Sequence, residues 1–168
     1  MSSSHFDIGL RETAAAAVRP IRTEDRSQLE TLLRASHNFT PEEMETALEV
    51  IDEALKGDPE YIINVVERDH IAGYECHGPA PLTEGTFDLY WIVVDPAAQK
   101  RGYGRLLLRA AEDDAAKRGG RLLLIETSSQ PAYDATVRFY KRNGYRLEAR
   151  VHDFYRRGDD KLILAKDL

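Results

Sequence analysis

The stretch that decides the fold is IVVDPAAQKRGYGRLLL, which runs from Ile92 to Leu108. It begins with a β-branched run that stops at Asp95-Pro96, and it ends in an apolar-periodic segment opened by two glycines, Gly102 and Gly104. β-Branched residues favour a strand, Pro interrupts it, and apolar residues at helical spacing favour a helix. The stretch therefore predicts a strand, a basic turn and a glycine-lined helix start, in that order.

A helix start of this kind can bind an anion. The first backbone N–H groups of a helix have no intrahelical partner and lie at the positive end of the helix dipole. Gly102 and Gly104 carry no side chain that would keep a bulky phosphate away from these groups. Four side chains of the same turn add hydrogen bonds or positive charge: Gln99, Lys100, Arg101 and Arg105. The turn therefore favours a ligand with two or more phosphates.

Composition limits the class of protein. A chain of 168 residues with 42% hydrophobic content is long enough for one ordinary domain with a real core. The formal charge of −6 argues against nucleic acid as a partner and suits a neutral or cationic one better. A single cysteine excludes an internal disulfide, and no metal spacing is found among the histidines. Because no apolar run is long enough to cross a membrane, we expect a cytoplasmic protein that does not associate with membranes.

The order of the expected elements indicates a mixed α/β fold. Residues 1–15 are small, polar and Ser-rich, which predicts a flexible tail, and residues 16–168 are expected to form a single domain. Strands are expected within 17–25, 61–69, 71–78, 86–95, 121–127, 145–155 and 161–167, and helices after 25 and over 40–55, 102–118 and 131–144. Strands that alternate with helices in the second half predict at least one parallel crossover.

Other glycine-rich phosphate sites fit the sequence less well. A dinucleotide-binding fold needs its glycines directly after the strand and a third small residue, but here a turn intervenes and the third position is Leu107. Glu126, at the end of a later strand, keeps that alternative open. A P-loop is excluded because no Lys-Ser/Thr pair follows the second glycine.

Two motifs together resemble those of a known family. QKRGYG, from Gln99 to Gly104, resembles the Q/R-x-x-G-x-G/A signature of the GNAT superfamily of acetyl-CoA-dependent N-acyltransferases. FYKRNGY, from Phe139 to Tyr145, resembles its second hallmark, an aromatic–Tyr pair on a helix that is followed by Gly and an aromatic residue at a strand start. The two motifs occur in the family's order and spacing, and the resemblance extends over about residues 17–168.

The resemblance implies a fold and a co-substrate. The expected fold is a central, mostly antiparallel sheet with a parallel, splayed pair formed by its fourth and fifth strands, flanked by helices. The co-substrate is acetyl-CoA, whose pyrophosphate would lie on the turn and whose pantetheine arm would pair with backbone of the preceding strand. The implied cofactor-binding residues are Ile92, Val93, Val94, Gln99, Lys100, Arg101, Gly102, Tyr103, Gly104 and Arg105.

Acetyl transfer to an amine requires a group that takes up a proton. An alkylamine with a pKa near ~10.4 is neutral only about once in a few thousand molecules at pH 7. Asp88 occupies the position at which histone-modifying members of the superfamily carry a glutamate base, eleven residues before Gln99. Ideal alternation along the strand predicts Asp88, Tyr90 and Ile92 on one face and Leu89, Trp91 and Val93 on the other. Asp88 is the candidate base, and a structural role for it is the alternative.

The thiol leaving group requires a proton donor. The family gives this role to the residue that matches Tyr140, while helical spacing alone also fits an aromatic core stripe of Tyr133, Val137 and Tyr140. Many members have Asn-x-x-Ala before the aromatic–Tyr pair, and this chain has Tyr133 and Thr136 instead. Ser128, Ser129 or Tyr133 are candidates to replace the Asn contact to the cofactor arm.

Other side chains offer alternative chemistry. Glu75, His77 and Glu126 are further candidates for a base or a water relay. A covalent route through Cys76 and His77 is disfavoured, because adjacent residues on a strand point to opposite faces.

The predicted activity is direct transfer of an acetyl group from acetyl-CoA to a primary amine of a small molecule or peptide, in a ternary complex. The alternative from another class is a CoA-binding regulatory module without transfer activity. A homodimer through the C-terminal strands is implied only by the resemblance.

Overall fold

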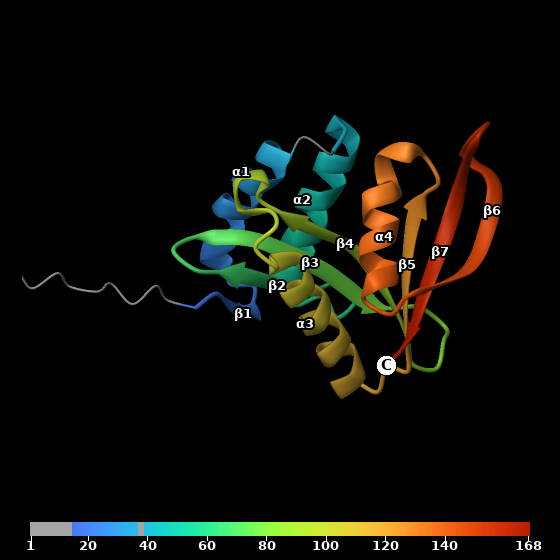
Figure 1. Cartoon of the computed structure of the whole chain (residues 1–168). Coiled ribbons are helices and arrows are strands. Elements are labelled where there is room, and N and C mark those ends of the chain that lie inside the picture. The colour runs from blue at the N-terminus through green and yellow to red at the C-terminus, as the bar shows by residue number, and fades with distance from the viewer. Residues whose placement is uncertain (1–14, 37–38) are drawn as a thin grey trace, which may run out of the picture.

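The computed structural model describes residues 15–36 and 39–168. Its strands are β1 Ala17–Pro20, β2 Ile62–Glu67, β3 Ile71–Pro79, β4 Thr86–Val94, β5 Leu122–Ser128, β6 Arg146–Arg156 and β7 Asp159–Asp167. Its helices are α1 Arg26–Ser36, α2 Pro41–Leu55, α3 Tyr103–Lys117 and α4 Asp134–Arg142 (Figure 1). Within the described ranges, no helix is long and apolar enough to span a membrane.

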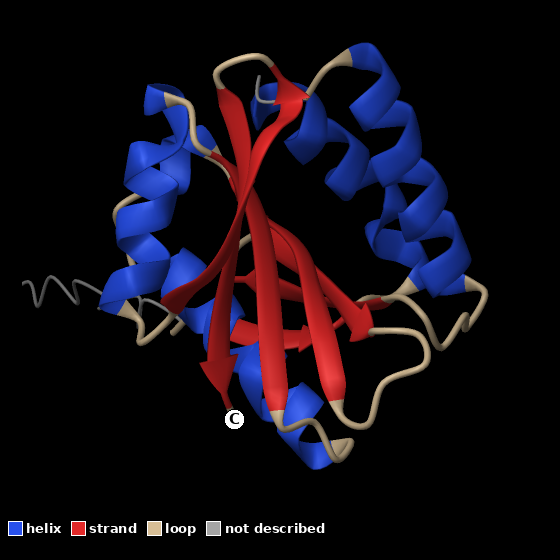
Figure 2. Cartoon of the chain, turned by 90° about the vertical axis from the view of Figure 1, so that its right-hand side faces the viewer, coloured by secondary structure: helices blue, strands red, loops and turns tan. Residues whose placement is uncertain are grey.

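The strands form one seven-stranded sheet in the order β1-β2-β3-β4-β5-β7-β6. Only the β4–β5 pair is parallel; the other neighbouring pairs of the sheet are antiparallel. Helices lie in two groups on opposite sides of the strands (Figure 2). This architecture confirms the predicted mixed α/β fold with a mostly antiparallel sheet and one parallel pair.

Each face of the sheet has its own core. On one face, α1 and α2 contribute Leu29, Leu33 and Ile51 to a cluster with strands β2, β3 and β4. On the other face, α3 and α4 contribute Leu108 and Tyr140 to a cluster with strands β4, β5 and β7. Because β4 takes part in both clusters, its alternate residues are packed on both sides and hold it rigidly at the centre.

The capping sequence of α2 is confirmed. Glu43 N donates to Thr40 Oγ1 at 3.2 Å, and Thr40 N donates to Glu43 Oε2 at 2.8 Å. This reciprocal pair satisfies two backbone donors and fixes where the helix begins. The start of α2 is thereby held close to β4, where the side chains of Phe39 and Trp91 make contact, with ring centroids 6.5 Å apart.

A β-bulge in β4 changes the predicted pattern of faces. Cys76 of β3 pairs with Trp91 and His77 pairs with Leu89, so that Tyr90 is an extra residue without a partner on β3. An extra residue in one strand shifts the alternation of side chains beyond it. The prediction that Ile92 shares a face with Asp88 was therefore wrong.

The observed faces follow from the bulge. Phe87, Leu89 and Ile92 pack with the α3 and α4 cluster, whereas Trp91 and Val93 pack with the α1 and α2 cluster. Trp91 and Val93 thus lie on the opposite face from Leu89, which also corrects the prediction for those two residues. The sequence gives no signal for this, because no Gly or Pro marks the position of the bulge.

The parallel pair is splayed, as predicted. β4 and β5 pair only over Thr86–Leu89 and Leu122–Ile125. Beyond these residues β4 continues to Val94 alongside β3 alone, and β5 continues to Ser128 alongside β7 alone. The inner backbone edge of β4 from Tyr90 to Val94 therefore has no partner strand on the β5 side.

Candidate active site

The basic turn leads from the free edge of β4 into α3. Gly102 is the N-cap residue, has a positive φ of 83° and lacks a side chain that could cap the helix. The φ of Lys100 is also positive, at 63°, so the turn contains two residues in the left-handed region. The N–H groups of residues 103–105 have no intrahelical acceptor and face outward from the helix start. The predicted phosphate-binding residues Gln99, Lys100 and Arg101 are exposed around this start.

Gly104 lies where α3 approaches α4. A Cβ atom built on Gly104 would lie 3.6 Å from Cζ of Phe139 and 4.0 Å from Cγ2 of Val94. These distances are ordinary van der Waals contacts, so a methyl group fits beside the Phe139 ring. The start of α3, the end of β4 and Phe139 of the aromatic motif are thus brought together.

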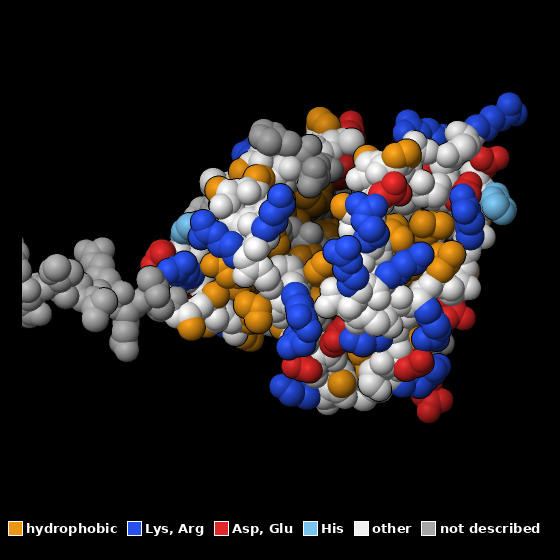
Figure 3. Space-filling model, viewed as in Figure 1, with side chains coloured by type: hydrophobic (Ala, Val, Ile, Leu, Met, Phe, Trp, Pro, Cys, Tyr) orange, Lys and Arg blue, Asp and Glu red, His pale blue; other side chains and the backbone are white. Residues whose placement is uncertain are grey.

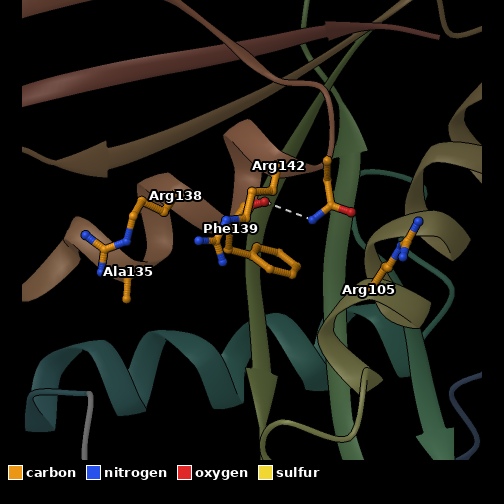
Figure 4. Close-up of a pocket in the computed structure, with 6 residues that line it drawn as sticks. Arg105, Ala135, Arg138, Phe139 and Arg142 are labelled. Atoms are coloured by element: carbon orange, nitrogen blue, oxygen red, sulfur yellow. Dashed lines mark hydrogen bonds between the residues drawn. The ribbon is translucent and has the colours of Figure 1, made fainter.

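A cavity of about 410 Å³ opens between α3 and α4. Its lining residues are Arg105, Ala135, Arg138, Phe139, Arg142 and Asn143. Figure 4 shows Arg105 on α3 and the other labelled residues on α4, with Asn143 donating to the backbone oxygen of Phe139 at 2.8 Å. Lys and Arg side chains surround a hollow on this face of the molecule (Figure 3). Three guanidinium groups at one cavity favour phosphate oxygens.

Sequence reasoning found Arg105 but missed Arg138 and Arg142. The two missed residues are four positions apart on α4, so they lie on one side of the helix. That spacing could have indicated a shared basic face. Only the packing of α4 beside α3 shows that this face meets the turn that is predicted to bind phosphate.

Tyr140 is buried, with 6% of its surface exposed, and its ring packs against Phe139 and Tyr145 at centroid distances of 5.2 and 5.5 Å. Its hydroxyl makes no hydrogen bond to another described residue, although every fully buried side-chain nitrogen or oxygen of the described part has a partner. The hydroxyl is therefore not fully enclosed. Burial and the charge of Glu75 raise the pKa of Tyr140. The hydroxyl therefore keeps its proton at neutral pH.

The predicted aromatic stripe on α4 does not include Tyr133. That residue lies in a separate 3₁₀ turn, Pro131–Tyr133, and is 44% exposed. The Ser128 hydroxyl donates to Asp159, and Asp160 N donates to Ser129 Oγ at 2.9 Å. Both serines therefore connect the segment before α4 to the start of β7. This structural role explains their hydrogen bonds without a contact to the cofactor arm.

Asp88 is half-buried on the α1 and α2 face of β4, immediately before the strands separate. Burial raises the pKa of Asp88, the charge of Glu126 adds to the rise, and Lys161 opposes it. Glu126 itself is paired with Lys161, with Oε2 and Nζ 2.7 Å apart. Asp88 and Tyr140 lie on opposite faces of the sheet, so only a ligand placed where β4 and β5 separate could contact both.

A buried polar chain connects β2, β3 and α3. Asn64 Nδ2 donates to Glu75 Oε1 at 2.6 Å, and the two ring nitrogens of His77 lie 2.9 Å from Glu75 Oε2 and 3.0 Å from Asp114 Oδ2. The side chains of Glu75 and His77 are fully buried, whereas that of Asp114 is 29% exposed and also accepts from Arg118. Burial lowers the pKa of His77, but hydrogen bonds and charges of Glu75 and Asp114 outweigh this and raise it. The His77 imidazole thus lies between two carboxyl groups inside the core. This polar chain of side chains lies next to the cluster that contains Tyr140.

Cys76 does not contribute to this chain. It packs in the α1 and α2 cluster, on the opposite face from His77, as strand alternation predicted. Burial raises the pKa of its thiol well above the ordinary value. A protonated, enclosed thiol is a poor nucleophile, which disfavours a covalent acetyl-enzyme.

Comparisons with known proteins agree with this geometry. The model of the acetyltransferase (GNAT) family matches residues 25–145. A crystal structure from Desulfovibrio desulfuricans, of a protein assigned to the GNAT family of acetyltransferases, is 43% identical and has a TM-score of 0.87, covering 91% of this chain and 99% of that chain. The uncharacterized N-acetyltransferase YvbK of Bacillus subtilis (strain 168) is 29% identical over 133 residues, 74% of this chain and 84% of YvbK.

The fold also matches more distant structures. The structure of yncA from Salmonella typhimurium with its cofactor acetyl-CoA is 21% identical and has a TM-score of 0.70, covering 92% of this chain and 94% of yncA. The glycine motif and the aromatic motif predicted an acetyl-CoA-dependent acetyltransferase. The matches confirm this prediction. The chain belongs to the GNAT family of acetyltransferases.

Proposed function

We propose that the protein transfers an acetyl group from acetyl-CoA directly to a primary amine while both are bound. The observation that carries this proposal is the continuous path formed by the free inner edge of β4, the basic turn and the start of α3. The backbone of Ile92, Val93 and Val94 would pair with the amides of the pantetheine arm. The turn from Gln99 to Arg105 would bind the pyrophosphate through backbone N–H groups and positive charge.

The arginine cavity supports an extended phosphate site. Arg105, Arg138 and Arg142 line the space directly beside the helix start. A ligand that carries phosphates beyond the pyrophosphate can use these guanidinium groups, which present donors in a planar fork. We therefore add Arg138 and Arg142 to the proposed cofactor-binding residues.

In the proposed reaction, Asp88 takes one proton from the ammonium form of the acceptor and releases it to solvent. The neutral nitrogen attacks the thioester carbonyl carbon, the new C–N bond forms and the C–S bond breaks. Tyr140 donates a proton to the departing thiolate, and the second proton lost by the nitrogen restores the Tyr140 hydroxyl through solvent, so that one proton is released per turnover. The raised pKa of Asp88 makes its carboxylate a stronger base than an exposed one. The raised pKa of Tyr140 keeps the donor protonated until negative charge develops on the sulfur.

The cofactor site can be tested by calorimetric titration of the cofactor-free protein with acetyl-CoA, with NAD as the competing ligand class. Gly104→Glu places bulk and negative charge where α3 meets Phe139, so it is expected to abolish binding. Gly104→Ala is the matched control, because the added methyl group makes only ordinary contacts and should preserve binding. Binding of NAD in place of acetyl-CoA, or equal binding by the Gly104→Glu variant, would refute the assignment of the turn.

Transfer itself can be tested with Tyr140→Phe in an assay of thiol release from acetyl-CoA with amine acceptors. We expect kcat to fall roughly 10²–10⁴-fold, the usual range for loss of a general acid, while the affinity for acetyl-CoA is kept. Acetyl-CoA binding without thiol release from any amine by the wild-type protein would favour a CoA-binding regulatory module instead.

A further inference from the structure

A second cavity, of about 300 Å³, lies on the face of β4 opposite to the arginine cavity. It is lined by Phe39, Glu42, Glu43, Thr46 and Trp91, which come from the start of α2 and from β4. No Lys or Arg is among its described lining residues, in contrast to the cavity between α3 and α4. The proposed transfer step assigns no role to this cavity.

Its floor is part of a continuous row of aromatic rings. Ring centroids of neighbouring residues are 6.5 Å apart for Phe39 and Trp91, 6.3 Å for Trp91 and Tyr90, and 5.8 Å for Tyr90 and Tyr61. The Trp91 indole Nε1 donates to the hydroxyl of the buried Tyr74 at 2.8 Å, so the indole is held in one orientation. The row exists because of the bulge, since ideal alternation would place Tyr90 and Trp91 on opposite faces.

The wall of the cavity is negatively charged. Glu43 is occupied in part by the capping bond to Thr40 N, whereas Glu42 is exposed and forms no ion pair within the described residues. Aromatic faces and a free carboxylate together favour a cation, because the ring quadrupole and the negative charge both attract it. Trp is the most favourable of the aromatic side chains for this contact.

The cavity is close enough to Asp88 to share one ligand with it. Asp88 and Trp91 are three positions apart on β4, which corresponds to at most about 10 Å along a strand. Both lie on the α1 and α2 face, and Tyr90 lies between them. A flexible chain of a few methylene groups can therefore place one end at Asp88 and the other over Trp91.

We propose that the acceptor is a dicationic aliphatic amine. One amino group is acetylated beside Asp88, and the second, an ammonium group, is bound between Trp91 and Glu42. This inference rests on the proposed acetyl transfer, which it makes more specific by naming the class of acceptor.

Binding and turnover can be measured separately. Trp91 is the only tryptophan of the chain, so its fluorescence reports on this cavity without requiring any reaction. The matched probes are 1,5-diaminopentane and 1-aminopentane, which differ only in the second amino group. We expect the diamine to change the Trp91 fluorescence at roughly 10-fold lower concentration and to have a roughly 10-fold higher kcat/KM in thiol release, as one cation–π contact and one carboxylate allow.

Two variants test the residues. Glu42→Gln keeps the fluorophore and should reduce the preference for the diamine severalfold, whereas Glu45→Gln, on the same helix but outside the cavity lining, should leave it unchanged. Trp91→Leu should reduce the ratio of kcat/KM for the diamine to kcat/KM for the monoamine toward unity.

The outcomes distinguish the two proposals. Equal kcat/KM for both amines in thiol release would overturn the dication site and leave acetyl transfer intact. A higher kcat/KM for a peptide with a neutral side chain than for the diamine would do the same. Selective quenching by the diamine without thiol release from any amine would support the cation site and overturn the proposed transfer. A diamine preference that Glu42→Gln and Trp91→Leu leave unchanged would also overturn the dication site.

Discussion

Replacement of His77 by Leu should destabilise the protein strongly, because His77 is the central member of the buried polar chain. Its two ring nitrogens contact Glu75 and Asp114 at 2.9 and 3.0 Å, and its side chain is fully buried. Leu fills most of the same volume but offers no hydrogen bond. The variant therefore leaves Glu75 with a buried carboxylate whose only remaining partner is Asn64.

Removing one partner of a buried ion pair costs about 3–5 kcal/mol. For a domain of this size each 1 kcal/mol lowers the melting temperature by roughly 2–4 °C, so we expect a decrease of about 6–20 °C. Arg118→Ala is the matched control. It also removes a partner of Asp114, but the Arg118 side chain is 52% exposed. An exposed pair contributes at most about 1 kcal/mol, so the control should shift by no more than about 4 °C.

The assay is thermal and urea unfolding of the wild-type and variant proteins at pH 5 and pH 8. Burial raises the pKa of Glu75, and this rise should increase when His77 no longer opposes it. A carboxyl whose pKa is higher in the folded than in the unfolded state loses stability as pH rises above its unfolded value, so the His77→Leu protein should itself be less stable at pH 8 than at pH 5. The double variant Glu75→Gln/His77→Leu removes the buried charge and should recover more than half of the loss.

Two results would refute this reasoning. A decrease of less than about 2 °C for His77→Leu would mean that the buried carboxylate of Glu75 does not depend on the imidazole. A double variant no more stable than His77→Leu would mean that the loss arises from packing and not from the uncompensated charge.

Three further predictions concern the site. Asp88→Asn should lower kcat/KM about 10²–10⁴-fold. It should also remove the acidic limb of the pH profile of kcat/KM, which the raised pKa of Asp88 places above 3.8. An unchanged acidic limb in the variant would exclude Asp88 as the base. The double variant Arg138→Gln/Arg142→Gln should weaken CoA binding in calorimetry roughly 10²–10⁴-fold, since each of the two arginines loses a charged hydrogen bond that contributes about 1.5–3 kcal/mol, whereas Arg157→Gln on the exposed final hairpin should have no effect. Cys76→Ala should keep full thiol release, because the thiol is buried and protonated; loss of turnover in a folded variant would revive the covalent route.

The order of elements could be predicted from local sequence signals. The capping sequence at Thr40, the glycine-lined start of α3 and the Gly144 stop after α4 are all short-range signals, and the structure confirms each of them. The splay of β4 from β5 was predicted only through the resemblance to the GNAT superfamily. Local sequence could not show it, because it depends on where a non-local strand pairing ends.

The missing parts of the site are those formed by tertiary contacts. Arg138 and Arg142 gain a partner surface only when α4 packs beside α3. The buried Glu75–His77–Asp114 chain joins two residues on one face of β3 to a residue of α3 that lies far along the sequence. Neither helical nor strand periodicity predicts a contact between residues so far apart. The bulge at Tyr90 is invisible to periodicity, since Tyr, Trp and Ile are all good strand residues.

The side chains of β4 alternate in one pattern before the bulge and in the opposite pattern after it. Before Tyr90, the odd-numbered Phe87 and Leu89 enter the α3 and α4 core; after it, the even-numbered Ile92 enters that core. Deletion of Tyr90 alone would restore one continuous pattern, as would insertion of one more residue at the same point. Either change would let β4 alternate regularly without a bulge, and Trp91 and Val93 would stay in the α1 and α2 core. The extra residue at Tyr90, and not the chemistry of the side chains, therefore explains why Leu89 and Trp91, two positions apart in the sequence, pack in different cores.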